Sequence, residues 1–132
     1  MDNFILNIPV YLILIFTIIT FLQSGFDKMF NWSANYEWLT GHFKGTFMGG
    51  MVSVLLAVIL VLEVLTGFLA LAAIFTLYLN NDPGFALWSL VLAAITLLML
   101  LFGQRVANDY AGAFTIVGYF IVIIFGIFLV TA

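Results

Sequence analysis

The sequence predicts an all-α integral membrane protein, a four-helix bundle with an interfacial amphipathic helix between its first and second spans. Three observations predict this class: 66% of the 132 residues are hydrophobic, only 7% are charged, and the mean hydropathy is +1.30. Soluble domains are typically about 45–50% apolar and about 25% charged. Because so apolar a chain cannot cover its surface with polar groups in water, a soluble enzyme and a nucleic-acid-binding protein are both excluded. We expect membrane lipid to surround it.

Four apolar runs are long enough to span a membrane, because a spanning helix needs about 20 residues at 1.5 Å per residue. Within a single domain over residues 1–132, we expect spans at about 8–26, 47–70, 85–102 and 111–130. The second run stays apolar as far as residue 79, which is longer than one crossing requires. Tilt, a bend near Gly67 or protrusion from the membrane would absorb the excess.

Polar segments separate these runs. Pro9 stands near the start of the first span, where its missing N–H is tolerated, and Asp27 and Lys28 close that span. Residues 80–84 are all turn formers and predict a tight connection, while residues 104–110 make a short polar break. The four spans should therefore form two helical hairpins.

The few basic residues predict the orientation of the chain. Lys28 and Lys44 follow the first span and Arg105 follows the third, so these two loops share a side. Basic residues in short loops tend to stay in the cytoplasm. We therefore expect both termini on the outer side of the membrane and the two basic loops in the cytoplasm.

The stretch over residues 31–44 predicts a helix that lies in the membrane plane. Trp32, Tyr36 and Phe43 recur at helical spacing, with polar residues on other faces. Such rings favour the headgroup zone. The interfacial aromatic candidates are Trp32, Tyr36, Trp38 and Phe43. Two interpretations are open: an ordinary interfacial anchor, or a flap over a lipid-soluble ligand such as a quinone.

The residue inventory limits the chemistry. The absence of cysteine excludes thiol nucleophiles, iron–sulfur clusters and Cys-ligated zinc, and His42 is the one histidine. A metal site needs several convergent donors, and the sequence has no cluster at ligand spacing. It has no phosphate-binding or dinucleotide-binding motif either. We expect no metal and no intrinsic cofactor, and catalysis by this chain alone stays an open question.

Glu63 is the one charged residue within a predicted span. It lies about 24 Å along its helix from Phe47, and an unpaired carboxylate in hydrocarbon costs at least about 2.5–3.5 kcal/mol. Its side chain must therefore be neutral, paired or directed at a polar interior. Small residues on the same helical face predict close contact with neighbouring helices. These helix-packing candidates are Gly49, Ser53, Ala57 and Gly67.

Polar side chains on the other spans form matching stripes. The predicted buried polar network comprises Glu63, Lys28, Ser24, Thr20, Thr96 and Tyr119. If the stripes meet, their hydroxyl groups and the flexible Lys28 side chain can satisfy the Glu63 carboxyl. Three roles remain open for the network: locking helix register, binding a ligand or quinone, and carrying a proton.

Two segments resemble a known family. Residues 24–30, Ser-Gly-Phe-Asp-Lys-Met-Phe, resemble the small-Gly-x-x-Lys-apolar signature of the DoxX family of small four-helix membrane proteins, and residues 62–67, Leu-Glu-Val-Leu-Thr-Gly, resemble its Glu-x-x-x-Gly segment. Members often carry an Arg early in the first helix, which this chain lacks. The resemblance implies that Lys28 and Glu63 pair or share a hydrogen-bond network. It also implies a membrane subunit of a thiosulfate:quinone oxidoreductase or another membrane-associated oxidoreductase complex.

We expect, as the leading function, a redox-complex subunit that anchors partner subunits and shapes a quinone pocket near Lys28, Trp32, Glu63 and Tyr119. The alternative is a membrane scaffold, assembly factor or chaperone with no redox role, which more distant relatives suggest. A small proton-coupled carrier using Glu63 is less favoured, since no second acidic residue lies in a span. The small-residue stripe of the second span would also serve a homodimer.

Overall fold

The structure, a computed structural model, describes residues 3–132. These residues form helices and no strand: α1 (Asn3–Leu6), α2 (Ile8–Phe30), α3 (Trp32–His42), the 3₁₀ turn η1 (Gly49–Met51), α4 (Val52–Asn80), α5 (Gly84–Val106) and α6 (Tyr110–Thr131). The helices α2, α4, α5 and α6 are long and apolar enough to cross a membrane. The predicted all-helical class is confirmed, with four helices that are long and apolar enough to span a membrane.

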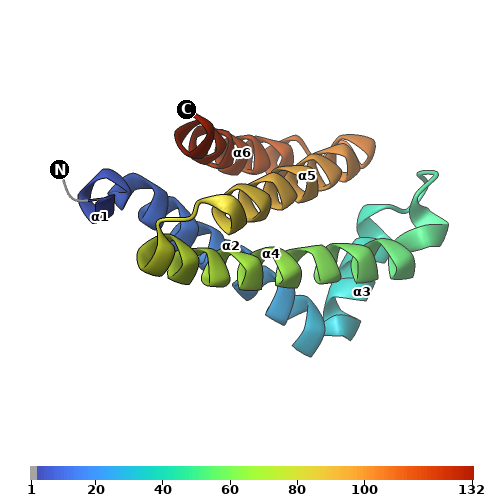
Figure 1. Cartoon of the computed structure of the whole chain (residues 1–132). Helices are drawn as coiled ribbons and strands as arrows, with labels where there is room; N and C mark the ends of the chain where they lie inside the picture. Colours follow the sequence, from blue (N-terminus) through green and yellow to red (C-terminus); the bar gives the residue numbers. More distant parts are fainter. Residues whose placement is uncertain (1–2) are drawn as a thin grey trace.

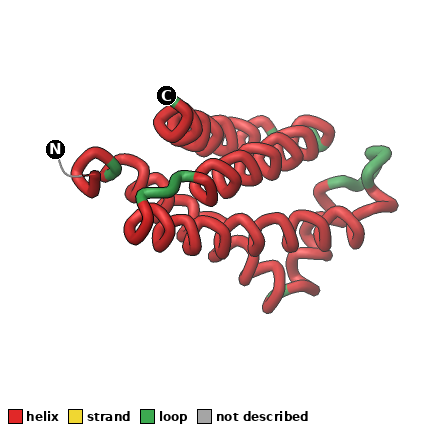
Figure 2. Tube along the Cα trace, in the orientation of Figure 1, coloured by secondary structure: helices red, strands yellow, loops and turns green. Residues whose placement is uncertain are grey.

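Each of the four long helices runs antiparallel to the one before it in the sequence (Figure 1). Both termini and the α4–α5 turn lie at one end of the molecule, and α3 with the loop before α4 lies at the other. The helix α2 packs along α4, α4 against α5, and α5 against α6, whereas α2 and α6 meet over a much shorter length. Short loops join the helices (Figure 2), as in antiparallel bundles.

Two helix boundaries differ from the predicted ones. The helix α2 continues to Phe30, because Asp27 accepts hydrogen bonds from the side-chain amides of Asn31 and Asn35 and does not end the helix. The second span begins later than residue 47: Gly45 has φ +82° and a 3₁₀ turn precedes α4. The helix α4 then runs without interruption through Gly67 to Asn80.

The predicted turn at residues 80–84 joins α4 to α5. Asn81 takes the left-handed conformation (φ 50°), in which its N–H bonds the Leu77 carbonyl and ends α4. Its side-chain oxygen accepts a 3.0 Å hydrogen bond from the amide of Asn7 at the start of α2. Asp82 accepts a 2.9 Å bond from the Gly84 N–H, which sets the entry into α5.

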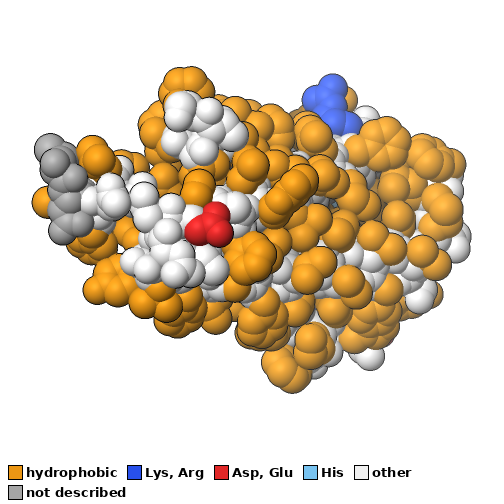
Figure 3. Space-filling model, viewed as in Figure 1, with side chains coloured by type: hydrophobic (Ala, Val, Ile, Leu, Met, Phe, Trp, Pro, Cys, Tyr) orange, Lys and Arg blue, Asp and Glu red, His pale blue; other side chains and the backbone are white. Residues whose placement is uncertain are grey.

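Large apolar side chains fill the centre of the bundle, and small residues let the helices approach. Leu14, Phe21, Leu90, Leu97 and Ile123 are almost completely inaccessible, as are several alanines on α4 and α5. The outer surface is also apolar: Figure 3 shows hydrophobic side chains over most of the visible face. An apolar exterior over a packed interior is what a lipid solvent requires.

The contact between α2 and α4 depends on two glycines. A Cβ on Gly25 would lie 2.7 Å from Val64 Cγ2 and 3.3 Å from the Val64 backbone nitrogen. A Cβ on Gly67 would collide with the Leu22 side chain. Gly67 therefore lies in close contact with α2, and the two helices approach each other closely beside Glu63 and one turn after it.

Ser53 and Ala57, two of the helix-packing candidates, are exposed in the single chain and do not pack inside its bundle. The first half of α4 turns Val52, Leu56 and Ile59 inward instead, because burying large apolar side chains stabilises the fold more than burying small ones. Gly49 lies in the 3₁₀ turn, half-buried, where a Cβ would sit 3.1 Å from the Phe43 carbonyl oxygen. It packs on the preceding loop, not on a neighbouring span.

We predict that Gly25→Ala destabilises the protein by about 1–3 kcal/mol, because the added methyl group must displace the α4 backbone. Thermal unfolding in detergent measures the change. Gly118→Ala is the matched control, since nothing lies within 4 Å of a Cβ at that position and alanine favours helix. Equal melting temperatures for Gly25→Ala and wild type would contradict the close α2–α4 contact.

Candidate functional site

A buried ion pair joins α2 and α4, and both of its residues belong to the predicted buried polar network. Lys28 Nζ lies 2.8 Å from Glu63 Oε1, and the two side chains are only 16% and 4% exposed. Lys28 also donates a 2.7 Å hydrogen bond to the Ser24 hydroxyl one turn earlier on α2. The close approach at Gly25 places these groups on facing helix surfaces. The structure thus brings together three residues of the predicted network.

The position of this pair follows from the cost of an isolated charge. A lone carboxylate or ammonium group in hydrocarbon is strongly unfavourable, and the mutual attraction of the two groups offsets that cost only when the geometry is good. The extra turn of α2 beyond residue 26 places Lys28 opposite Glu63, within ion-pair distance. A helix that ended at Asp27 could not.

One cavity, the α2–α6 cavity, lies on the Glu63 side of the pair. It has a volume of about 370 Å³ and is lined by polar side chains from α2, α4 and α6, among apolar residues of α2, α5 and α6. Those polar side chains are Thr20, Gln23, Ser24, Glu63 and Tyr119. The sparse contact between α2 and α6 leaves this space open. Four members of the predicted network therefore border one cavity.

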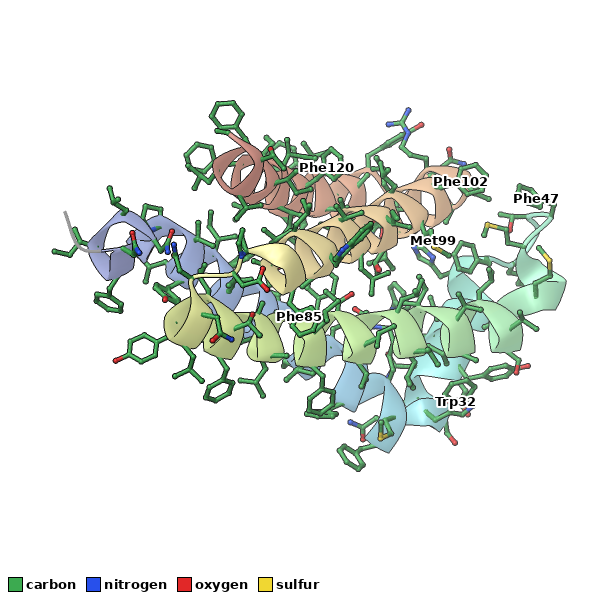
Figure 4. All side chains as sticks on the ribbon, viewed as in Figure 1. Trp32, Phe47, Phe85, Met99, Phe102 and Phe120 are labelled. Atoms are coloured by element: carbon green, nitrogen blue, oxygen red, sulfur yellow. The ribbon has the colours of Figure 1, made fainter. Side chains whose placement is uncertain are left out.

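A second cavity, the α3 cavity, lies on the Lys28 side. It measures about 680 Å³ and is enclosed by α3, the loop after it, the first half of α4 and the second half of α5. Its lining is mainly apolar and aromatic, and Figure 4 shows Phe47, Met99 and Phe102 gathered at this end of the bundle. Lys28, Asn35, His42 and Gln104 are its polar residues. Such a lining suits an apolar ligand with a few polar atoms.

A contact between His42 and Asp109 lies beside the α3 cavity, which His42 lines. His42 Nε2 lies 3.1 Å from Asp109 Oδ2, and the imidazole stacks on Trp38 with ring centroids 4.6 Å apart. Phe43 beside it is buried and lies against Gly103 of α5. The end of α3 is therefore fastened to the α5–α6 turn.

Asp109 also caps α6. Its Oδ1 accepts a 2.9 Å hydrogen bond from the Gly112 N–H, which is a helix N-cap. This backbone bond, followed by the bond with His42, holds the pKa of the Asp109 carboxyl below its usual range. Sequence reasoning missed the His42–Asp109 contact, because the two residues are 67 positions apart. From the sequence, only the role of Asp109 as the N-cap of the last helix could have been recognised.

Other predicted network members do not reach Glu63. The Thr96 hydroxyl donates to the Leu92 carbonyl of its own helix at 2.8 Å, and the Tyr119 ring packs edge-on against Phe16 at 5.8 Å. Thr66, one turn beyond Glu63, is fully buried and its hydroxyl oxygen has no hydrogen-bond partner. Within the described residues, most Ser and Thr hydroxyls on the four long helices bond a carbonyl of their own helix, which lies closer to them than the Glu63 carboxyl.

The aromatic side chains within residues 31–44 lie in two different environments. Trp38 and Phe43 line the α3 cavity, although Trp38 is largely exposed on its outer side. Tyr36 is exposed, and Trp32 is half-buried and lines neither cavity. In Figure 4 Trp32 lies below α4, apart from Phe47 and Met99. We expected one pocket around Lys28, Trp32, Glu63 and Tyr119. The structure has two separate cavities instead, and Trp38 lines the cavity of Lys28 where we expected Trp32.

No protein-family model, curated protein or solved structure matches this chain. The resemblance to the DoxX family therefore remains an expectation from residues 24–30 and 62–67. The geometry of the ion pair and its two cavities carries the functional argument.

We predict that Lys28→Met destabilises the protein by about 3–5 kcal/mol, because it leaves the Glu63 carboxyl buried without its cation. The double variant Lys28→Met/Glu63→Leu should recover most of that loss, since no unpaired charge remains. Thermal unfolding in detergent compares the variants. Lys44→Met, which removes an exposed cation, is the control. If Lys28→Met melts like Lys44→Met, the pair does not stabilise the fold.

We predict that Asp109→Asn lowers the melting temperature at neutral pH and that its difference from wild type shrinks in acid. Because folding lowers the Asp109 pKa, the carboxylate stabilises the protein above its ordinary pKa of about 3.9, and this contribution is lost as the pH falls through the lowered value. Melting curves of both proteins from neutral pH to about pH 3 measure the difference. A difference that widens with acid would contradict the assignment.

Proposed function

We propose that this protein is a DoxX-like subunit of a membrane-associated oxidoreductase complex that binds a quinone-type ring in the α3 cavity. The observation that carries the proposal is an apolar and aromatic cavity of about 680 Å³ bordered by one cation of a buried ion pair. Pockets for small organic ligands commonly measure about 300–1,000 Å³ and combine apolar walls with few polar groups. A lipid-soluble ring with polar oxygens matches this lining.

The ion pair supports an orienting role for Lys28. Its ammonium group has three hydrogens, of which one bonds Ser24 and another faces Glu63. The remaining hydrogen is available to a ligand oxygen in the α3 cavity, which Lys28 lines. The Trp38 ring and the aromatic residues of the loop and of α5 supply flat surfaces for a ring.

The chain would act with other subunits. It has no cysteine, and we assign it no electron carrier of its own, so a partner must supply the electrons or accept them. The apolar exterior suits residence in a membrane. The resemblance to the DoxX family supports the bacterial inner membrane, and the positions of the basic residues support periplasmic termini. The helix α3 would lie at the cytoplasmic interface beneath the headgroups.

We predict that the purified protein in mild detergent binds a decyl-benzoquinone saturably. Leu55→Trp, which places a large ring in the α3 cavity, should weaken binding about tenfold or more, a change of about 1.4 kcal/mol. Val54→Trp is the matched control, because Val54 neighbours Leu55 on α4 and is 65% exposed. Quenching of tryptophan fluorescence in each variant, calibrated against its own unliganded spectrum, measures Kd.

The outcome separates the two functions expected from the sequence. Absence of quinone binding by the wild type, together with co-purification of a helical membrane protein that has no redox centre, would replace this proposal with a scaffold or chaperone role. Quinone binding that Leu55→Trp and Val54→Trp weaken equally would place the ligand outside the α3 cavity.

A further inference from the structure

The α2–α6 cavity is lined by polar groups that the protein does not pair with one another. Among the residues that the structure describes, the hydroxyls of Thr20 and Tyr119 and the amide of Gln23 form no hydrogen bond. The hydroxyls of Thr17 and Thr96, by contrast, bond carbonyls of their own helices. Because polar groups within a membrane are costly without partners, the three groups at this cavity need a partner from outside the chain.

Glu63 directs one carboxylate oxygen toward the same cavity. Its Oε1 lies 2.8 Å from Lys28 Nζ and is completely enclosed. Its Oε2 accepts no hydrogen bond within residues 3–132 and keeps accessible surface, and Glu63 lines the α2–α6 cavity but not the α3 cavity. A carboxylate oxygen accepts hydrogen bonds and donates none. The most buried polar residue of the cavity, only 3% exposed, therefore requires a ligand that donates.

Water alone does not suit this space. A bound water occupies about 30 Å³ and needs two to four polar partners, so the free groups of the cavity can hold about three waters. Three waters fill only a small part of the volume of about 370 Å³. Apolar side chains of α2, α5 and α6 line the remainder. The occupant should therefore combine a polar group with an apolar body.

The cavity opens toward the lipid between α2 and α6. Ile19, which lines it, is 64% exposed on the outer surface, and Gln23, one turn later, is exposed as well. Both residues lie within the apolar span of α2. The sparse contact between α2 and α6 leaves this side uncovered. A ligand can therefore enter from the membrane and leave its chain among the lipids.

We propose that the α2–α6 cavity binds the head of a neutral, hydroxyl-bearing lipid, such as a long-chain alcohol or an acylglycerol. The ligand hydroxyl donates to Glu63 Oε2 and accepts from the hydroxyl of Tyr119 or Thr20. A neutral ligand is favoured because Lys28 balances Glu63 and, among the described residues, no other charged side chain lines this cavity. The site is separate from the quinone site proposed for the α3 cavity, and either can be absent without the other.

Competition between matched ligands tests the class of ligand. The full chain is placed in bilayer discs of diacyl phosphatidylcholine, whose headgroup has no hydrogen-bond donor, and is labelled by dodecanol that carries a photoreactive diazirine beside its hydroxyl end. We expect saturable labelling of α2 and α6 at the cavity, located by mass spectrometry of peptides. Unlabelled dodecanol should block labelling at a concentration at least about tenfold lower than dodecyl methyl ether, which accepts hydrogen bonds but donates none.

Each other outcome contradicts one step of the inference. Equal competition by the alcohol and the ether would overturn the need for a donor. Stronger competition by dodecylamine, a cation at neutral pH, than by dodecanol would overturn the preference for a neutral ligand. Labelling that does not saturate, or that spreads over the lipid-facing surface, would leave the cavity to water alone and overturn the site.

Variants at the mouth locate the site. Ile19→Trp should obstruct the entrance and raise the concentration of probe needed for half-maximal labelling about tenfold, a change of about 1.4 kcal/mol. Ile15→Trp is the matched control, because Ile15 lies one turn earlier on α2, is 44% exposed and lines neither cavity. Equal labelling of the two variants would place the ligand elsewhere on the surface.

The double variant Lys28→Met/Glu63→Leu tests the acceptor. It removes the carboxylate without leaving an unpaired ammonium group, so the alcohol and the ether should then compete within about twofold of each other. A tenfold preference that persists in this variant would overturn the role of Glu63. If the variant does not fold, the comparison of alcohol and ether on the wild type still decides whether the site requires a donor.

Discussion

The ion pair between Lys28 and Glu63 is the constraint on which the rest of the structure depends. A single carboxyl within the longest span cannot remain unpaired in hydrocarbon, so α2 must extend far enough to supply a cation and must approach α4 closely. Gly25 permits that approach, and the Ser24 hydroxyl accepts a further hydrogen bond from the ammonium group. The register of the first two spans follows from these contacts, and α5 and α6 then pack on the register that results.

The same constraint divides the interior. Because α2 is drawn toward α4, it meets α6 over little of its length, and the α2–α6 cavity remains on the Glu63 side. On the Lys28 side, α3 turns back from the end of α2 and reaches the α5–α6 turn, where His42 contacts Asp109. The α3 cavity lies beneath this connection. One charged pair thus borders two chemically different spaces: in one, hydroxyl, amide and carboxyl groups lie among apolar side chains, and the other is lined mainly by apolar and aromatic side chains.

Much of the fold was predictable because lipid imposes simple rules on sequence. Run length predicted the four spans, turn residues predicted the α4–α5 connection, and the cost of a buried charge singled out Glu63 with Lys28 as its partner. The buried face of α4 was less predictable. Both faces of a lipid-embedded helix are apolar, so periodicity did not separate the exposed Ser53 and Ala57 from the buried Val52 and Leu56.

The sequence by itself determined the solvent, the number of spans and the one intramembrane carboxyl, because these depend on composition and on spacing along a single helix. Only the tertiary structure decided which polar groups meet. The His42–Asp109 contact and the two cavities each involve residues from different helices. Their positions depend on helix rotation and on the path of α3, and these are set by packing between elements far apart in the chain.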